Sequence, residues 1–205
     1  MRKEFLLFPL LMVLFLNVKA QDIKIKSEYL KSAYYNVIKN GSQENWGNYV
    51  EKFPDRFEDF DSIFGYRNDS KGPLYDMYQQ YIDLFFVARQ YVSSEEYYEK
   101  VINIARTGSW DADAVNLFQA GIVDLLSNDS INPQEKSVFF KVLSSFSNTD
   151  ITHFWSFYYD GLYPDCYGEK YKSTISALLG YERLIHLMKM CYKDICNSME
   201  NDREH

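Results

Sequence analysis

The sequence is short of the residues that catalytic and metal sites most often use. It has three histidines and three cysteines, and neither a CxxC nor an HxxxH spacing occurs, which disfavours a zinc site. It also lacks the GxSxG, P-loop and GxGxxG motifs of common hydrolases and nucleotide-binding proteins. We therefore expect no cofactor, no metal and no catalytic residues that sequence motifs can identify.

The few cysteines all lie near the C-terminus, at Cys166, Cys191 and Cys196. In an oxidising compartment two of them could pair and one would be left over. Cys191 and Cys196 are five positions apart, which separates them by about 140° around a helix. We therefore favour a disulfide between Cys166 and one of the other two, and three free buried thiols remain the alternative.

Positive charge is also scarce, since the formal net charge is −7 at pH 7. An acidic surface repels phosphate backbones, so nucleic acid is not expected as a partner. A basic protein partner is electrostatically permitted.

The N-terminus has the pattern of a signal peptide. Arg2 and Lys3 precede an apolar run over residues 5–16, and Val18-Lys19-Ala20 ends in a small residue. The run is too short to span a hydrocarbon core of about 30 Å as a helix. We predict cleavage after Ala20, export to the periplasm or the medium, and no membrane span in the mature chain.

Residues 21–205 are predicted to form one all-α domain with a short polar C-terminal tail. Helical apolar spacing and stop signals predict about nine helices joined by short links, which favours antiparallel helical hairpins and is compatible with a solenoid-like arrangement. Residues 67–72 are predicted to be a loop. The predicted helices lie at about 23–40, 46–53, 55–64, 73–92, 94–107, 112–127, 133–146, 149–160 and 169–199.

Aromatic residues are abundant, with 18 Tyr, 15 Phe and 3 Trp. Adjacent tyrosines such as Tyr97-Tyr98 are not expected to point inward together on one helix, so some tyrosine should be exposed. Because Trp and Tyr are frequent in binding hot spots, we place a candidate binding surface in the middle third of the chain. Its residues are Trp110, Asp111, Asp113, Trp155, Tyr158, Tyr159 and Asp160.

Each part of that candidate surface also has a purely structural interpretation. Trp110 and Trp155 could be core residues, and Asp111 and Asp113 are better explained as helix caps than as an acid and base pair. The acidic residues between Asp55 and Asp61 are expected to form the solvated face of their helix.

Several segments resemble a group of small exported bacterial helical proteins of unassigned role, some of which are immunity proteins against toxins delivered by contact. The resemblance lies in FPDRFEDF at 53–60, FGY at 64–66, WDADA at 110–114, and FW at 154–155 followed by DGLYP at 160–164. It implies an exported helical protein that binds a toxin, and it carries over no catalytic residue.

Two functions therefore compete. The first is a non-catalytic exported binding protein, most specifically an immunity-type inhibitor of a toxin that reaches the periplasm. The alternative is a protein that binds or acts on cell-envelope glycans, with exposed aromatic rings as stacking platforms and Asp111 and Asp113 as acid and base. The oligomeric state is not predicted.

Overall fold

The computed structural model describes residues 7–67, 69–127, 131–161 and 168–203, with side chains from Ala20 to Ser198. It is an all-α single domain, as the sequence predicts, and ten α-helices lie within the described residues. They are α1 (Leu7–Lys39), α2 (Gln43–Lys52), α3 (Phe57–Phe64), α4 (Tyr78–Ala88), α5 (Ser94–Ala105), α6 (Ala114–Ser127), α7 (Pro133–Ser144), α8 (Asn148–Tyr159), α9 (Glu169–Ala177) and α10 (Glu182–Arg203).

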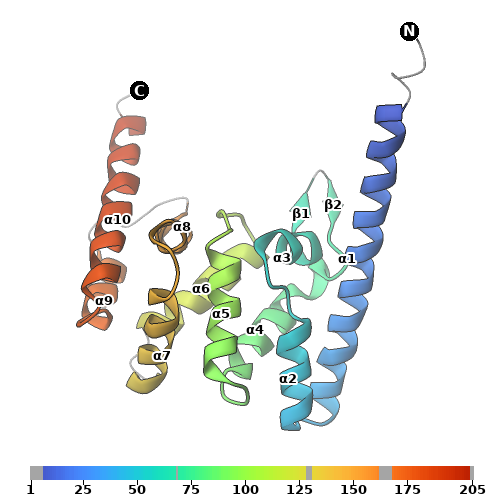
Figure 1. The fold of residues 1–205 in the computed structure, drawn as a ribbon, viewed down its shortest axis with the longest axis horizontal. Helices are drawn as coiled ribbons and strands as arrows, with labels where there is room; N and C mark the ends of the chain where they lie inside the picture. The colour runs from blue at the N-terminus through green and yellow to red at the C-terminus, as the bar shows by residue number, and fades with distance from the viewer. Residues whose placement is uncertain (1–6, 68, 128–130, 162–167, 204–205) are drawn as a thin grey trace.

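The helices form a solenoid-like array in which each helix packs against helices that lie nearby along the chain. The most extensive contacts join α1 to α2, α5 to α7 and α8 to α10, and α6 packs against both α4 and α9. Figure 1 shows the helices following one another along the longest axis, from α1 at one end to α9 and α10 at the other. Most helices therefore have neighbours on two sides, which determines what is buried.

A local capping signal correctly located the start of α7. Asn132 Oδ1 accepts a hydrogen bond from Gln134 N at 2.9 Å, and Pro133 occupies the first turn of α7. The next helix was expected from about residue 149, whereas α8 begins at Asn148 after Ser147, whose hydroxyl accepts from Asp150 N at 3.1 Å.

Two long predicted helices are each divided. The segment 73–92 contains a 3₁₀ turn, η1 (Tyr75–Met77), before α4, because Leu74 N donates to Ile63 O at 3.0 Å and ties this segment to α3. The segment 169–199 breaks between α9 and α10, where Gly180 has a φ of +93°. A positive φ favours glycine and ends a helix. Gly180 is therefore the residue in the sequence that indicates this break.

The predicted loop at 67–72 contains a short antiparallel hairpin. Strands β1 (Tyr66–Arg67) and β2 (Ser70–Lys71) pair Tyr66 with Lys71 and Arg67 with Ser70. The hairpin lies beside α1 in Figure 1.

The core is a continuous set of aromatic rings. Phe53 and Phe85 stack with centroids 3.9 Å apart, and Phe118 contacts Phe60 at 5.1 Å. Tyr97 and Tyr98 are both buried, so the expectation that one of them must be exposed was wrong. It failed because α5 packs against α3, α7 and α8, which buries more than one face of the helix.

The α1 helix passes without a break through Ala20 and Gln21, where cleavage is predicted. Ile23 is the first buried residue among the α1 side chains that the structure describes. In the described part of the chain, no helix is both long and apolar enough to cross a membrane. Signal-peptide cleavage stays a prediction.

Candidate functional site

The predicted binding residues do not form one surface. Trp155, Tyr158 and Tyr159 lie in the core on α8, with exposures of 0%, 0% and 4%. Trp155 packs edge-on against Tyr158 at 5.5 Å, and Tyr159 packs against Tyr192 of α10 at 4.5 Å. These three residues join α8 to its neighbours, and their predicted role in a binding surface is corrected to a role in the core.

Trp110 and Asp160 do come together, although they are 50 positions apart. Asp160 Oδ2 accepts a hydrogen bond from Trp110 N at 3.0 Å, and Asp160 Oδ1 accepts from Gly161 N at 2.9 Å. Gln119 Nε2 donates to Asp160 O at 2.7 Å from the neighbouring α6. Asp160 is exposed, and it connects the end of α8 to the loop before α6.

Asp111 and Asp113 lie on the exposed loop before α6. Asp111 was expected to cap this helix, but α6 begins at Ala114, and Asp111 Oδ1 accepts only from the adjacent Ala112 N, at 2.7 Å. Asp113 has a φ of +54°, a left-handed conformation that aspartate tolerates. This turn lets Asp113 Oδ2 accept a hydrogen bond from Tyr75 OH at 2.6 Å.

The Tyr75–Asp113 bond joins this loop to η1 and the hairpin. It raises the pKa of Tyr75 to about 12, because the adjacent carboxylate disfavours ionisation of the phenol. The Tyr75 ring lies 5.7 Å from the ring of Tyr66, which is 49% exposed. We call Tyr66, Tyr75, Asp76, Asp111 and Asp113 the hairpin–loop surface. Its two tyrosines were not predicted, because the parts of this surface meet only through tertiary contacts.

Asp61 differs from the other acidic residues of its segment. It was expected on a solvated helix face, but its side chain is 1% exposed and its Oδ2 pairs with Arg67 Nε. Burial raises the pKa of Asp61, and the charge of Arg67 opposes that shift. Asp61 is therefore a structural ion-pair partner for the hairpin.

The cysteines are only partly described. Cys196 is disulfide-bonded, whereas Cys191 is a free, buried thiol with its Sγ 3.1 Å from Ser156 Oγ. Burial raises the pKa of Cys191. Cys166 lies outside the described residues, so the predicted pairing partner is not identified.

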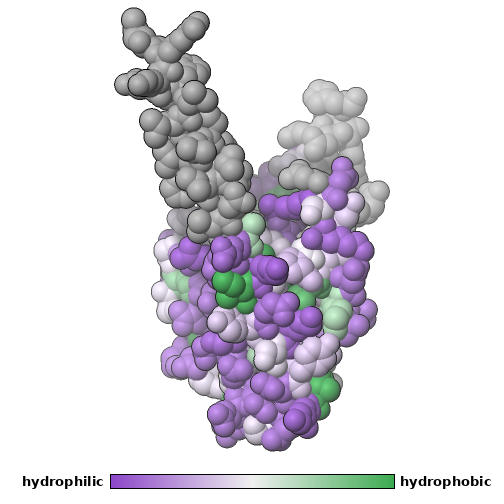
Figure 2. All heavy atoms as spheres, turned by 90° about the vertical axis from the view of Figure 1, so that its right-hand side faces the viewer, coloured by the Kyte–Doolittle hydropathy of each residue, from purple (hydrophilic) through white to green (hydrophobic). Residues whose placement is uncertain are grey.

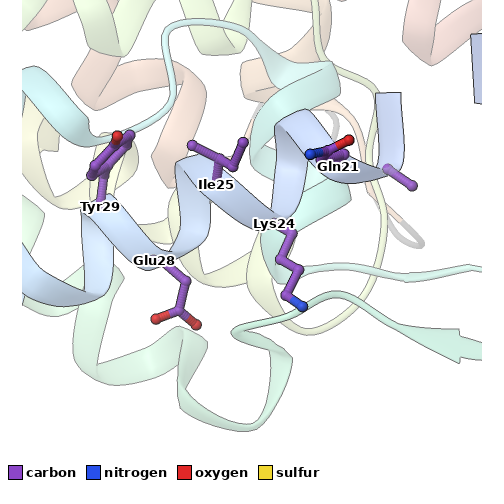
Figure 3. Close-up of a pocket in the computed structure, with 6 residues that line it drawn as sticks. Gln21, Lys24, Ile25, Glu28 and Tyr29 are labelled. Atoms are coloured by element: carbon purple, nitrogen blue, oxygen red, sulfur yellow. The ribbon is translucent and has the colours of Figure 1, made fainter. Parts of the chain in front are cut away.

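A hollow on α1 is open to solvent. The described residues that line it all belong to α1 and include Gln21, Lys24, Ile25, Glu28 and Tyr29 (Figure 3). Figure 2, which faces α1, shows a mostly hydrophilic surface with separate apolar patches. Within the described residues, no group of three or more His, Cys, Asp or Glu side chains could hold a metal ion.

Comparison with known proteins gave no significant match to a family model, to a curated protein sequence or to a solved structure.

Lys170, at the contact between α8 and α9, is expected to make the stability of the protein depend on pH. Burial lowers its pKa to about 8, while its Nζ donates to Tyr158 O and lies 4.3 Å from the Tyr158 ring, both of which favour the charged form. Above pH 8 the folded protein releases this proton before the unfolded chain does, so Lys170 makes the free energy of unfolding rise with pH. We expect a gain of about 1–2 kcal/mol between pH 7.5 and 9.5 relative to Lys170→Met.

The comparison is made by denaturant unfolding at several pH values. Tyr158, Tyr159 and Cys191 have raised pKa values and act in the opposite direction. Both proteins contain them, so they cancel in the difference. Parallel pH profiles for the two proteins would contradict the prediction.

Proposed function

We propose that this chain is an exported, non-catalytic binding protein whose hairpin–loop surface receives a protein partner. The observation that supports it most directly is the Tyr75–Asp113 hydrogen bond, which holds exposed carboxylates beside two tyrosines on a rigid helical array. Tyrosines provide contact area at low entropic cost, and carboxylates raise the association rate with a basic partner. The most specific form of the proposal is an immunity-type inhibitor of a toxin.

Export is part of the proposal and has its own support. The N-terminal signal pattern ends at Ala20, and Ile23 is the first residue of α1 whose described side chain is buried. A chain that began at Gln21 would keep the buried side chains of α1, including Ile23, Leu30, Ala33 and Val37.

The glycan-acting alternative has weaker support. That alternative requires exposed aromatic rings, whereas Trp155, Tyr158 and Tyr159 are buried in the core and cannot stack on a sugar ring without unfolding α8. Asp111 and Asp113 are both exposed on one loop, whereas a glycosidase places two carboxyl groups on opposite sides of the scissile bond.

The binding experiment uses protein recovered from the exported fraction and the product of the neighbouring reading frame, because immunity genes lie beside toxin genes. The variant is Asp111→Asn with Asp113→Asn. Asparagine keeps the size of aspartate and tolerates the left-handed φ at position 113. We expect the association rate constant to fall about 3- to 30-fold while the melting temperature changes by less than about 2 °C.

Asp83→Asn with Asp194→Asn is the matched control, since both aspartates are exposed and lie outside the hairpin–loop surface, and this variant removes the same two negative charges. An equal loss of rate in the control would mean that net charge alone is responsible, and the surface would be rejected. Sedimentation with cell-wall glycan, without binding to the neighbouring product, would favour the alternative. Deletion of the gene should harm cells only when the toxin is present.

A further inference from the structure

A second candidate site lies between α1 and the hairpin, next to the hairpin–loop surface. It is a hollow of about 410 Å³ lined by residues of α1, α3 and the hairpin. A chain that begins at Gln21 loses Ala20 from this lining and keeps Ile23 of α1, Asp61 and Ser62 of α3, and Arg67, Ser70 and Lys71 of the hairpin. Because the hollow collects side chains from three elements, it differs from the single-helix hollow on α1. Figure 1 shows the hairpin and α1 side by side at this position.

Arg67 is held in place by a buried carboxylate. Asp61 pairs with Arg67 through Nε, and the side-chain exposures are 1% for Asp61 and 61% for Arg67. An arginine has five N–H donors, so a contact made through Nε leaves those of the two Nη groups for another acceptor. A fixed guanidinium of this kind is suited to binding a planar carboxylate through two parallel hydrogen bonds.

Two glycines fix the base of the hairpin against α3. A Cβ on Gly65 would lie 2.3 Å from Asp61 Oδ1, and a Cβ on Gly72 would lie 2.4 Å from Ile63 O. Gly72 N donates to Gly65 O at 2.9 Å, which closes the hairpin above α3. This close approach holds Arg67 over Asp61, so the hollow is formed before any ligand binds.

The remaining walls complement a small acid. Lys71 also lines the hollow, but its Nζ is engaged elsewhere, 2.5 Å from Asp76 Oδ1 and 5.1 Å from the Tyr75 ring. Arg67 pairs with Ser70 and Lys71 pairs with Tyr66 across the hairpin, and neighbouring residues of a strand point to opposite faces, so Arg67 rather than Lys71 faces Asp61 and the hollow. Ser62 and Ser70 add hydroxyl groups, and Ile23 and Pro73 supply apolar surface.

We propose that this hollow binds a carboxylate attached to a short apolar group, with Arg67 as the recognition residue and Asp61 as the residue that positions it. The proposal does not depend on the protein partner of the hairpin–loop surface. The same chemistry is found in a free short-chain acid and in the C-terminus of a peptide, and the experiment separates these two sources.

The probes are butyrate and N-acetyl-Ala-Ala with a free carboxylate, each compared with its neutral amide. Binding is followed by ¹H–¹⁵N NMR on the labelled protein. We expect saturable shifts of the Arg67 Nε–H signal and of the Ser70 and Lys71 amides, with a Kd on the order of 1 mM, and no shifts with the amides. Tighter binding of the peptide acid would identify a peptide C-terminus as the source, and tighter binding of butyrate would identify a free acid.

Arg67→Gln should weaken binding at least about tenfold, whereas Arg56→Gln, an exposed arginine just before α3, should change it by less than about twofold. Because Arg67→Gln leaves the buried Asp61 unpaired, Asp61→Asn with Arg67→Gln provides a variant with a neutral pair and no change in net charge. This double variant should keep the native spectrum and lose binding.

Asp61→Asn alone should weaken binding at least about threefold. It should also increase the rate at which the Arg67 Nε–H exchanges with solvent. A general loss of stability would not act on this one N–H group alone. The proposal is overturned if the acids bind no better than the amides. It is also overturned if Arg56→Gln weakens binding as much as Arg67→Gln, or if the double variant binds as well as the wild type.

Discussion

Trp155→Ala is expected to lower the free energy of unfolding by about 3–5 kcal/mol. The side chain is fully buried, and its ring packs against Phe154 at 4.9 Å and Tyr158 at 5.5 Å. Alanine would leave a cavity in α8, the helix that packs against both α6 and α10. Denaturant unfolding followed by circular dichroism measures the loss.

Two further variants test the cause of that loss. Trp155 Nε1 has no hydrogen-bond partner among the described residues, so Trp155→Phe should lose packing volume without losing a hydrogen bond, at a cost of about 1–2 kcal/mol. Trp110→Ala removes the same side chain from a half-buried position and should cost about 1 kcal/mol or less. Equal losses for Trp110→Ala and Trp155→Ala would contradict the assignment of Trp155 to the core.

Lys100→Met is expected to cost about 2–4 kcal/mol of the free energy of unfolding. Lys100 is 8% exposed, and its Nζ donates to Phe53 O at 2.7 Å and to Glu51 O at 3.3 Å, and pairs with Asp55. Methionine fills a similar volume but leaves the carbonyl groups at the end of α2 without their donor.

Lys141→Met is the matched control because the Lys141–Glu95 pair is exposed, with side-chain exposures of 74% and 65%. We expect it to change stability by less than about 0.5 kcal/mol, as exposed ion pairs usually do. Thermal and chemical unfolding of the two variants measure the difference. A similarly small loss for both variants would mean that Lys100 contributes no more to the free energy of unfolding than a surface lysine does.

The fold class was predictable because its signals are local. Asn132 and Pro133 mark the start of α7 within a few residues, and apolar spacing identified most of the helices. The burial of Tyr97 together with Tyr98 was not predictable in this way, because it depends on α5 having neighbours on more than one side. The amphipathic pattern of one helix predicts a single buried face, whereas α5 has more than one.

The candidate site was predictable only in part, because its residues are distant in sequence. Asp111 and Asp113 were identified, but Tyr75 reaches Asp113 across 38 positions and Arg67 reaches Asp61 through the folded hairpin. Trp155 and Tyr159 had the composition of a binding hot spot and lie in the core. Residue type alone does not separate an aromatic anchor from an aromatic core residue.

The main helix–helix contacts join helices no more than three places apart along the chain, which makes this molecule nearly one-dimensional. In such an array, stability is approximately a sum of terms from each helix and its nearest neighbours, and local opening begins most easily at the ends. The hairpin is built on α3 and lines one hollow together with α1, so it lies near one end, while Trp155 lies in the other half of the array. A loss of packing at α8 would therefore destabilise α10 more than α1, α2 and α3. The two halves of the chain would then unfold at different stages.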